Sequence, residues 1–207
     1  MITIKTTTAV ILRRPAVTSK PTIPVLDYTH FHTPHKRQNF VAELGNALSN
    51  VGFFSLSHHP VNLDLVKKTY HMMETLFQLP LERKQLYEPK HIRGQRGYTS
   101  FAKEHAKDSS LADLKEFWHI GPLLSRQRCK QLNYPDNLWP TEIPDFYKTL
   151  SCLYEQMQSC SLNLLLACDE YLKLKTSSLK EMAYEGDSIL RLIHYPALDT
   201  IDCQGVR

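Results

Sequence analysis

Apolar residues recur at helical spacing in several segments of the chain. Between residues 35 and 51 they keep three- and four-residue steps, and Gly52 follows as a helix stop. Residues 62–80 show the same spacing, with an asparagine N-cap before it and a proline at its end. The spacing continues without interruption over residues 144–174, which predicts the longest helix of the protein. A short helix is expected over residues 177–186.

Other apolar runs are too short for helices and predict strands. They cover residues 22–28, 52–60, 114–120 and 188–196. The run over 52–60 is continuously apolar after a glycine, which is typical of a buried strand of about five residues. Residues 88–140 have weak periodicity and many turn formers. With no internal repeat, the order of elements predicts one helix-rich α+β unit.

Composition excludes several classes of protein. The chain has 207 residues, 42% of them hydrophobic, so it can bury a core. Its 25 basic and 21 acidic residues give a net charge of +4 with no block of like charges, which indicates neither nucleic-acid nor membrane binding. No apolar run reaches the length of a membrane span. Five cysteines at irregular spacing favour reduced thiols and a cytoplasmic location.

The N-terminus differs from the rest of the chain. Residues 1–21 are rich in threonine, contain four basic residues and lack acidic ones, a composition similar to that of organelle transit peptides. The simpler interpretation is a flexible leader over residues 1–21, followed by a domain over residues 22–207.

Closely spaced histidines raise the question of a metal site. His30, His32 and His35 lie within six residues, and imidazoles so close could bind zinc. The alternative is a polar loop that joins a strand to a helix. His58 and His59 are adjacent, and neighbouring residues of a strand point to opposite faces, so these two do not readily share one ion.

A glycine-punctuated segment carries residues that can bind an anion. The sequence HIRGQRGYTSF contains Arg93, Arg96 and Tyr98, and arginine is well suited to carboxylates. The alternative is a solvated turn. The chain has neither a Gly-x-Ser-x-Gly nucleophile motif nor a glycine-rich phosphate loop followed by a helix.

Six segments, taken in order and spacing, resemble one family. They are IPVLDY, VGFFSLSHHPV, LFQLPLERK, RGYTSF, DLKEFWHIG and LRLIHYP. Together they resemble the N-terminal part of the non-haem iron oxygenases related to isopenicillin N synthase. The resemblance runs from about residue 23 to the C-terminus and is carried by the ordered set rather than by any one motif.

The resemblance implies a fold, cofactors and a gap in the active site. It implies N-terminal helices that lead into the first strands of a double-stranded β-helix, or jelly roll, which would be incomplete in this chain. The family holds Fe(II) with a His-x-Asp pair and a distant histidine, and most members use 2-oxoglutarate. None of the ten histidines has Asp or Glu two positions later. We therefore expect neither Fe(II) nor 2-oxoglutarate to bind fully to this chain.

Three residues are candidates for ligand binding by resemblance. Tyr195 corresponds to a tyrosine that hydrogen-bonds a carboxylate of cosubstrate or substrate in relatives. Arg96 and Tyr98 fall near a substrate-contacting loop, about one residue out of register. The family often has asparagine two positions before the tyrosine, where this chain has Ile193, and that departure weakens the case for 2-oxoglutarate.

Two functional hypotheses remain open. In the first, the chain is the N-terminal portion of an oxygenase that oxidises a small molecule with O2, and it is catalytically incompetent alone because it lacks the metal ligands. Its unpaired sheet edges would then favour self-association. In the second, the chain is a non-catalytic product that binds a carboxylate ligand or a protein partner.

Overall fold

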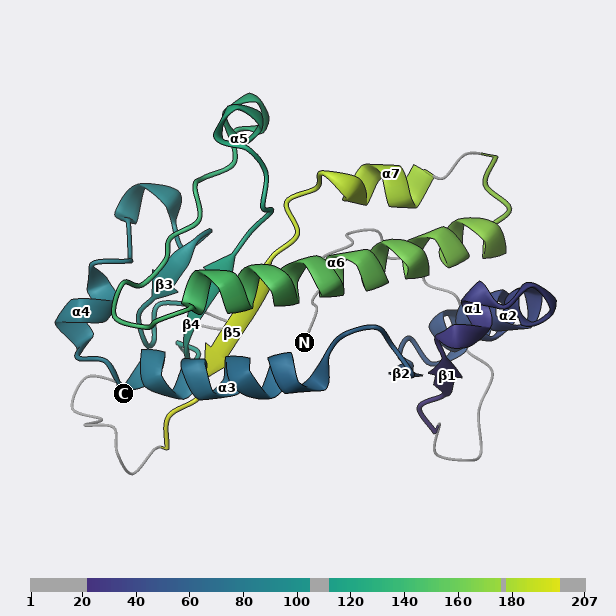
Figure 1. The fold of residues 1–207 in the computed structure, drawn as a ribbon, viewed down its shortest axis with the longest axis horizontal. Coiled ribbons are helices and arrows are strands. Elements are labelled where there is room, and N and C mark those ends of the chain that lie inside the picture. Colours follow the sequence, from purple (N-terminus) through teal and green to yellow (C-terminus); the bar gives the residue numbers. More distant parts are fainter. Residues whose placement is uncertain (1–21, 105–111, 176–177, 198–207) are drawn as a thin grey trace. The chain divides into compact units, whose positions relative to one another are not determined.

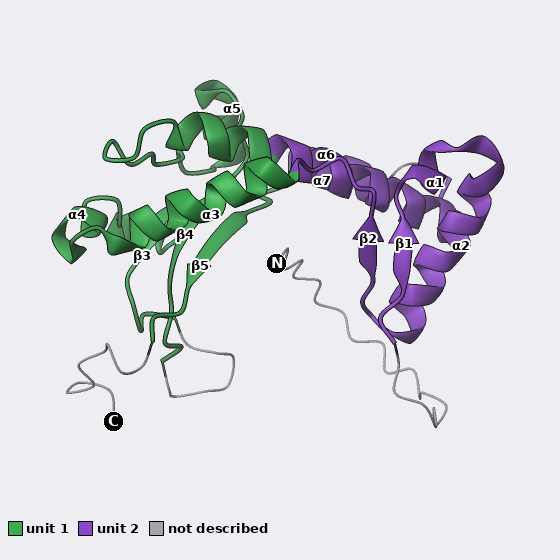
Figure 2. Ribbon diagram, turned by 60° about the horizontal axis from the view of Figure 1, so that its bottom comes forward, with its two compact units in different colours: residues 1–2, 63–154, 186–207 green, residues 3–62, 155–185 purple. Residues whose placement is uncertain are grey.

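The structure, a computed structural model, describes residues 22–104, 112–175 and 178–197. The predicted leader, residues 1–21, lies outside the described residues. The chain packs into two compact units, which Figure 2 colours separately. Unit 1 contains the described parts of residues 63–154 and 186–207, and unit 2 contains those of residues 3–62 and 155–185. The predicted single domain stays a prediction, because two packing units can belong to one domain.

Unit 2 contains a two-stranded parallel sheet. Its strands are β1 (Val25–Asp27) and β2 (Ser55–Ser57), with Leu26 opposite Leu56. Its helical segments are α1 (Thr29–His32), α2 (Pro34–Asn50), residues 155–171 of α6 (Phe146–Tyr171) and α7 (Ser178–Tyr184). The buried core of this unit consists of Leu26, Phe31, Phe40, Val41, Leu44 and Ala167.

Helix α2 confirms the prediction made from its apolar spacing. It begins at Pro34, whose fixed φ angle suits the first turn of a helix. Phe40 and Leu44 lie one turn apart and are 0% and 1% exposed. Gly52 follows the helix with a φ angle of +84°, a conformation that stops a helix and that glycine adopts without strain.

The prediction for residues 52–60 is wrong in length and in burial. Strand β2 covers only three residues, none of them buried, and Phe53 is 70% exposed. Within the described residues β2 pairs with a single strand, β1. Alternate side chains of a strand point to opposite faces, so a sheet with a core on one face cannot bury a continuous apolar run.

Unit 1 contains a three-stranded antiparallel sheet in the order β3-β4-β5. The strands are β3 (Gly97–Thr99), β4 (Glu116–Ile120) and β5 (Leu190–His194). Tyr98 pairs with Trp118, which pairs with Leu192. The helical segments of this unit are α3 (Leu63–Gln78), α4 (Leu81–Gln85), the 3-10 helix η1 (Lys90–Ile92), α5 (Arg126–Leu132) and the first turns of α6. Helix α3 lies alongside the sheet (Figure 1).

The core of unit 1 forms where α3 and α6 meet one face of this sheet. It is made of Met72, Leu76, Phe77, Tyr98, Trp118, Ile120, Ile143, Phe146, Leu150, Tyr154 and Leu192. The Trp118 and Phe146 rings meet edge to face, with centroids 5.7 Å apart. The strand supplies alternate residues to this core and the helices supply residues at three- and four-residue steps, as the sequence pattern predicts.

The remaining predicted elements are confirmed with shorter ends. The helices predicted over residues 62–80, 144–174 and 177–186 correspond to α3, α6 and α7. Residues 114–120 and 188–196 form β4 and β5. Helices α1, α4 and α5, the 3-10 helix η1 and strand β3 were not predicted.

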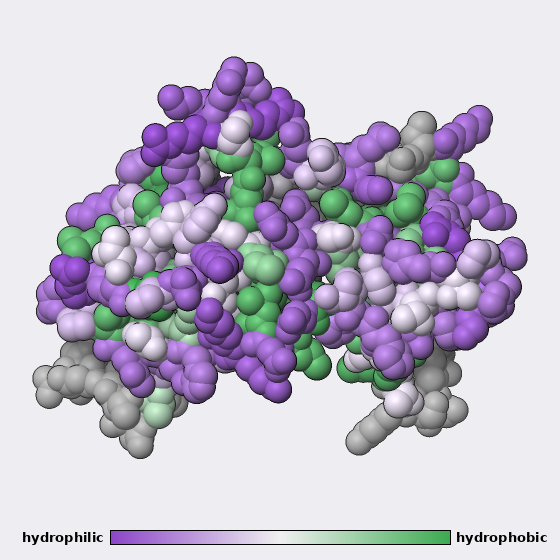
Figure 3. Space-filling view, in the orientation of Figure 1, coloured by the Kyte–Doolittle hydropathy of each residue, from purple (hydrophilic) through white to green (hydrophobic). Residues whose placement is uncertain are grey.

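The surface is mixed in character. The face drawn in Figure 3 is mostly hydrophilic with separate hydrophobic patches. Within the described residues, each helix is too short or too polar to cross a membrane.

Candidate functional site

The sheet of unit 1 presents two faces with different chemistry. Register and alternation place Tyr98, Glu116, Trp118, Ile120, Leu190, Leu192 and His194 on the face covered by α3 and α6, here called the helix face. The other side chains of the strands, Thr99, Phe117, His119, Arg191 and Ile193, form the opposite face. Polar residues gather on both faces and are described in turn.

Glu116 is the centre of a buried polar network on the helix face. It is 5% exposed and accepts hydrogen bonds from Lys84 Nζ at 2.7 Å, from the Tyr98 hydroxyl and from His194 Nδ1 at 2.8 Å. Burial alone would raise the pKa of Glu116, but the bonds from Lys84, Tyr98 and His194 outweigh it and hold that pKa below its usual range. The carboxylate is therefore charged and fully occupied by protein groups.

The same network explains the position of Lys84. This lysine is 7% exposed on helix α4, and its ammonium group also donates to the carbonyl oxygen of Phe77 at 3.0 Å. A buried charge is tolerated only with such partners. The pKa of Tyr98 is raised, first by burial and then by the neighbouring Glu116. Its hydroxyl therefore stays protonated and donates a hydrogen bond to the carboxylate.

Arg96 also meets a carboxylate of the protein itself. It is 1% exposed, its Nη2 donates to Asp187, and its Nη1 donates to the Gln95 carbonyl at 2.8 Å. Asp187 lies just before β5, so the contact joins the segments that enter β3 and β5. Gly121 lies against the guanidinium, because a Cβ there would be 2.1 Å from Arg96 Cζ.

The opposite face carries a second set of charges. Arg191 donates to both carboxylate oxygens of Glu104, at 3.1 and 3.3 Å, and Lys115 lies 2.7 Å from the same carboxylate. The Arg191 guanidinium stands 4.4 Å from the centroid of the Phe117 ring. Burial would raise the pKa of Glu104, but Lys115 and Arg191 together lower it. This face is therefore polar and held in place by ion pairs.

Tyr195 is the exposed member of the predicted site residues. It directly follows β5 and is 62% exposed. Continuing the alternation of the strand places it on the side of Arg191 and Ile193, away from the helix face. Its neighbour His194 is anchored to Glu116 and stacked on Phe77, with ring centroids 5.1 Å apart. The end of β5 is thus fixed one residue before the tyrosine.

The structure does not gather the three predicted site residues in one place. Tyr98 is 0% exposed on the helix face, Arg96 is paired with Asp187, and Tyr195 is exposed on the opposite side of the sheet. Ligand binding by any of them stays a prediction. Sequence reasoning missed Glu116, although its place two residues before Trp118 in the apolar run EFWHI marks it as an inward-facing carboxylate.

The described part of the chain contains no set of side chains placed to bind a metal ion. Among residues 22–104, 112–175 and 178–197, no three His, Cys, Asp or Glu side chains are placed to hold a metal ion. His30 and His32 belong to helix α1. From the sequence, either a zinc site or a polar loop was expected at these residues. His30 lies 3.1 Å from Lys36 Nζ, and the His32 ring packs against Tyr28. The hypothesis of a local zinc site is not supported.

Comparison with known proteins identifies the class. Residues 23–142 match the family described as non-haem dioxygenase in morphine synthesis N-terminal, and the chain belongs to that family. The resemblance inferred from the six sequence segments is thereby confirmed.

Two individual relatives are similar to most of this chain. The proline hydroxylase buaE of Petromyces alliaceus is 32% identical over 186 residues, which cover 86% of this chain and 56% of the relative. The 2-oxoglutarate-dependent dioxygenase traH of Penicillium crustosum is 26% identical, with the same coverage of 86% and 56%. The chain therefore spans about half the length of the curated relatives it matches.

Solved structures share the fold. A crystal structure of a 2OG-Fe(II) oxygenase family protein from Caulobacter crescentus matches with a TM-score of 0.75 and 32% identity, over 88% of this chain and 59% of that one. The full-length Neurospora crassa T7H in complex with alpha-KG matches with a TM-score of 0.70 at 22% identity, over 84% and 54%. The mixed helix and sheet fold of this chain is that of the 2OG-Fe(II) oxygenases.

Proposed function

We propose that this chain is the N-terminal portion of an Fe(II)- and 2-oxoglutarate-dependent oxygenase that oxidises a small molecule with O2. Strands β3, β4 and β5 are then the first strands of an incomplete jelly roll, and the helices of unit 1 support them. The family match over residues 23–142 and the names of the relatives support this proposal. The four cysteines of the described residues form no disulfide with one another, which is compatible with a reducing cytoplasm.

The family match carries the oxygenase proposal, and the exposed phenol of Tyr195, held beside an anchored His194, carries the proposed role of this chain in ligand binding. A tyrosine hydroxyl can donate a hydrogen bond to a carboxylate of cosubstrate or substrate. The network of Glu116 fixes the preceding residue, so the phenol is presented from a rigid strand end rather than from a free loop. The contribution of this chain is to bind and orient the cosubstrate or substrate. The opposite face of the sheet forms part of the wall of that binding site.

The residues described here do not fit an iron site. They include no set of three metal-ligating side chains, and no histidine of the sequence precedes Asp or Glu by two positions. We therefore propose that the chain alone is catalytically incompetent. Iron, which activates O2 in relatives of this kind, would be held by ligands from outside the described residues.

Binding of 2-oxoglutarate to the 207-residue chain tests the role of Tyr195. We expect measurable binding by ligand-observed NMR, and Tyr195→Phe should weaken it by about tenfold, the effect of losing one hydrogen bond to a charged group. Tyr70→Phe is the matched control, because Tyr70 is equally exposed at 62% on helix α3. Equal affinity in Tyr195→Phe and the unsubstituted chain would contradict the proposed contact.

Turnover by the chain alone tests its incompetence. With Fe(II), ascorbate and O2 present, we expect no succinate from 2-oxoglutarate above a protein-free control. Succinate formation that a chelator abolishes would show that the chain holds iron after all.

A non-catalytic binding role is the second candidate, and the exposure of Tyr195 favours it equally. It predicts carboxylate binding that is unchanged when metal is removed with a chelator. Arg96→Ala is a poor test of such binding, because the loss of a buried arginine paired with Asp187 lowers the stability of the fold whether or not Arg96 binds a ligand.

A further inference from the structure

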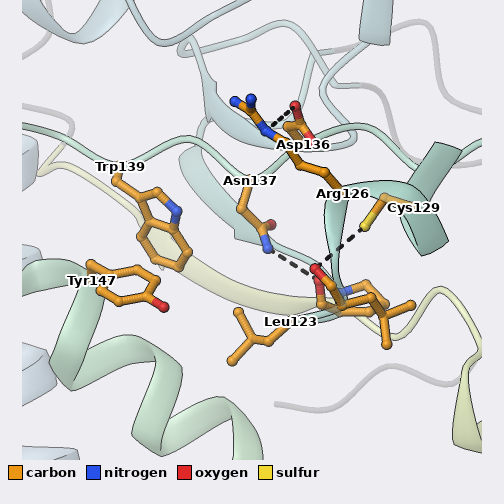
Figure 4. Close-up of a pocket in the computed structure, with 9 residues that line it drawn as sticks. Leu123, Arg126, Cys129, Asp136, Asn137, Trp139 and Tyr147 are labelled. Atoms are coloured by element: carbon orange, nitrogen blue, oxygen red, sulfur yellow. Dashed lines mark hydrogen bonds and ion pairs between the residues drawn. The ribbon is translucent and has the colours of Figure 1, made fainter.

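A cavity of about 300 Å3 lies beyond the C-terminal end of β4. Its lining comes from the segment after Gly121, from α5, from the segment that follows α5 and from the start of α6, as Figure 4 shows. Its volume is at the small end of ligand pockets in proteins, which span about 300–1,000 Å3. All of its lining residues belong to unit 1.

This cavity is remote from the exposed tyrosine. The register pairs Ile120 with Leu190 and Glu116 with His194, so the strands run in opposite directions. Tyr195 therefore lies beside the beginning of β4, whereas the cavity opens beyond its end, roughly 15 Å further along a strand of five residues. The site is separate from the one proposed above.

The wall of the cavity is aromatic on one side. Trp139 and Tyr147 stand nearly perpendicular, with ring centroids 4.9 Å apart and an angle of 87° between the planes. Leu123 and the buried thiol of Cys129 contribute apolar surface on the other side (Figure 4). Such a corner suits an apolar or aromatic side chain of a ligand.

The mouth of the cavity carries one positive and one negative charge. Arg126 Nε lies 3.8 Å from Asp136 Oδ2, and the two side chains are 87% and 61% exposed. An ion pair this long and this exposed adds little to stability, so both groups can turn to a ligand without loss to the fold.

Asn137 is not available to a ligand, because its amide is used within the protein. Its Oδ1 accepts from Gly121 N at 2.7 Å, and its Nδ2 donates to the carbonyl oxygens of Gly121 and Pro122 at 3.1 and 3.3 Å. These bonds hold the floor of the cavity in place. The ligand contacts that remain are the aromatic corner and the two opposite charges.

We propose that this cavity binds a free amino acid with an aromatic or apolar side chain. The ammonium and carboxylate of an amino acid sit on one carbon, so a single ligand can contact both Arg126 and Asp136, whose nearest charged atoms are 3.8 Å apart. The carboxylate would bind Arg126, the ammonium would bind Asp136, and the side chain would pack against Trp139 and Tyr147. The proposal does not depend on the oxygenase function.

Tryptophan fluorescence and calorimetry on the full chain test this proposal. Trp118, one of the two tryptophans, is 0% exposed in the core and gives a constant background, so a ligand-dependent change reports Trp139. We expect saturable binding of phenylalanine, and binding at least tenfold weaker of phenylacetate, which lacks the ammonium, and of phenethylamine, which lacks the carboxylate.

Charge variants provide the matched comparison. Arg126→Gln and Asp136→Asn should each weaken phenylalanine binding by about tenfold. Lys130→Gln should leave it unchanged, because Lys130 is exposed on the same helix but outside the cavity lining. No saturable signal by either method, equal affinity for the three probes, or full affinity in Arg126→Gln would each overturn the proposal.

Discussion

The two ring nitrogens of His119 meet groups that fix its protonation. Nδ1 lies 2.7 Å from the carbonyl oxygen of Gly94, which only accepts, and Nε2 receives a hydrogen bond from Arg191 Nε, which only donates. The ring is therefore neutral, with its proton on Nδ1. Burial first, and then the charge of Arg191, lowers the pKa of His119 to about 4.

The depressed pKa makes part of the stability dependent on pH. The unfolded chain takes up a proton on this histidine near its ordinary pKa of about 6.5, whereas the folded chain does so only near pH 4, so stability is full above pH 6.5 and falls between those values. The loss is at most about 3 kcal/mol. His119→Gln keeps one donor and one acceptor without titrating, and it should flatten the slope of unfolding free energy between pH 7 and 4. An equally steep slope in the variant would contradict this reasoning.

Gly121 is required by its neighbour rather than by its backbone. Its φ angle is not positive, yet a Cβ would be 2.1 Å from Arg96 Cζ, and the guanidinium is held by Asp187. We expect Gly121→Ala to lower the unfolding free energy by about 1–3 kcal/mol, as overpacking does. In the Arg96→Ala background the same change should have little effect, and denaturant unfolding of the four proteins measures the coupling. Additive effects would rule out the contact as the cause.

At the scale of elements, helix α6 carries the core of unit 1 through its first turns. Leu150 is 0% exposed among residues of α3 and the sheet. Leu150→Ala should lower the unfolding free energy by about 2–5 kcal/mol because it leaves a cavity. The exposed Lys148→Ala on the same helix should change it by less than about 0.5 kcal/mol in the same denaturant titration. A comparable loss in both variants would point to helix propensity instead of packing.

Elements with a long repeat could be predicted, and short ones could not. Helices α2, α3 and α6 cover enough turns for the apolar spacing to be unambiguous. Strand β3 has only three residues and begins at Gly97, whose φ angle of +70° suits the turn before it. Its existence depends on pairing with β4, which no local pattern records. Helix α4 also depends on a distant contact, because Lys84 donates a hydrogen bond to Glu116, 32 residues later.

The sequence shows which residues of the candidate site can bind an anion, but not which partners they meet in the fold. Tyr98 and Arg96 were chosen for their chemistry, and the structure gives each of them an internal carboxylate. The sequence contains Glu116 and Asp187, but the pairing across 18 and 91 positions follows only from the fold. Tyr195 lies just beyond the end of β5 and is exposed.

At the scale of the whole molecule, the outer strand β5 affects solubility, because its outer edge is unpaired in the described residues. In the described residues β5 has one paired neighbour, and Ile193 on its opposite face is only half-buried. A strand in this position leaves backbone N–H and C=O groups that can pair with another copy of the chain. We expect the isolated chain to self-associate and to bind a hydrophobic dye.

A charge introduced on β5 tests that expectation. Ile193→Lys should reduce both the dye signal and the association seen by sedimentation. Leu86→Lys removes an apolar residue that is 68% exposed and outside the strands, so it should change neither. A monomeric, cooperatively melting chain that binds no dye would contradict the expectation.

The network around Glu116 has a consequence for how this protein can diverge. Four side chains from four elements, Lys84, Tyr98, Glu116 and His194, satisfy one another, and three of them are almost fully buried. A substitution that removes the carboxylate of Glu116 leaves the buried ammonium of Lys84 without its partner. A substitution that removes Lys84 first leaves the buried carboxylate without the ammonium. Either path crosses a less stable intermediate, so descendants should exchange these positions together or keep them all. We therefore expect sequence change at these four positions to be slow and correlated.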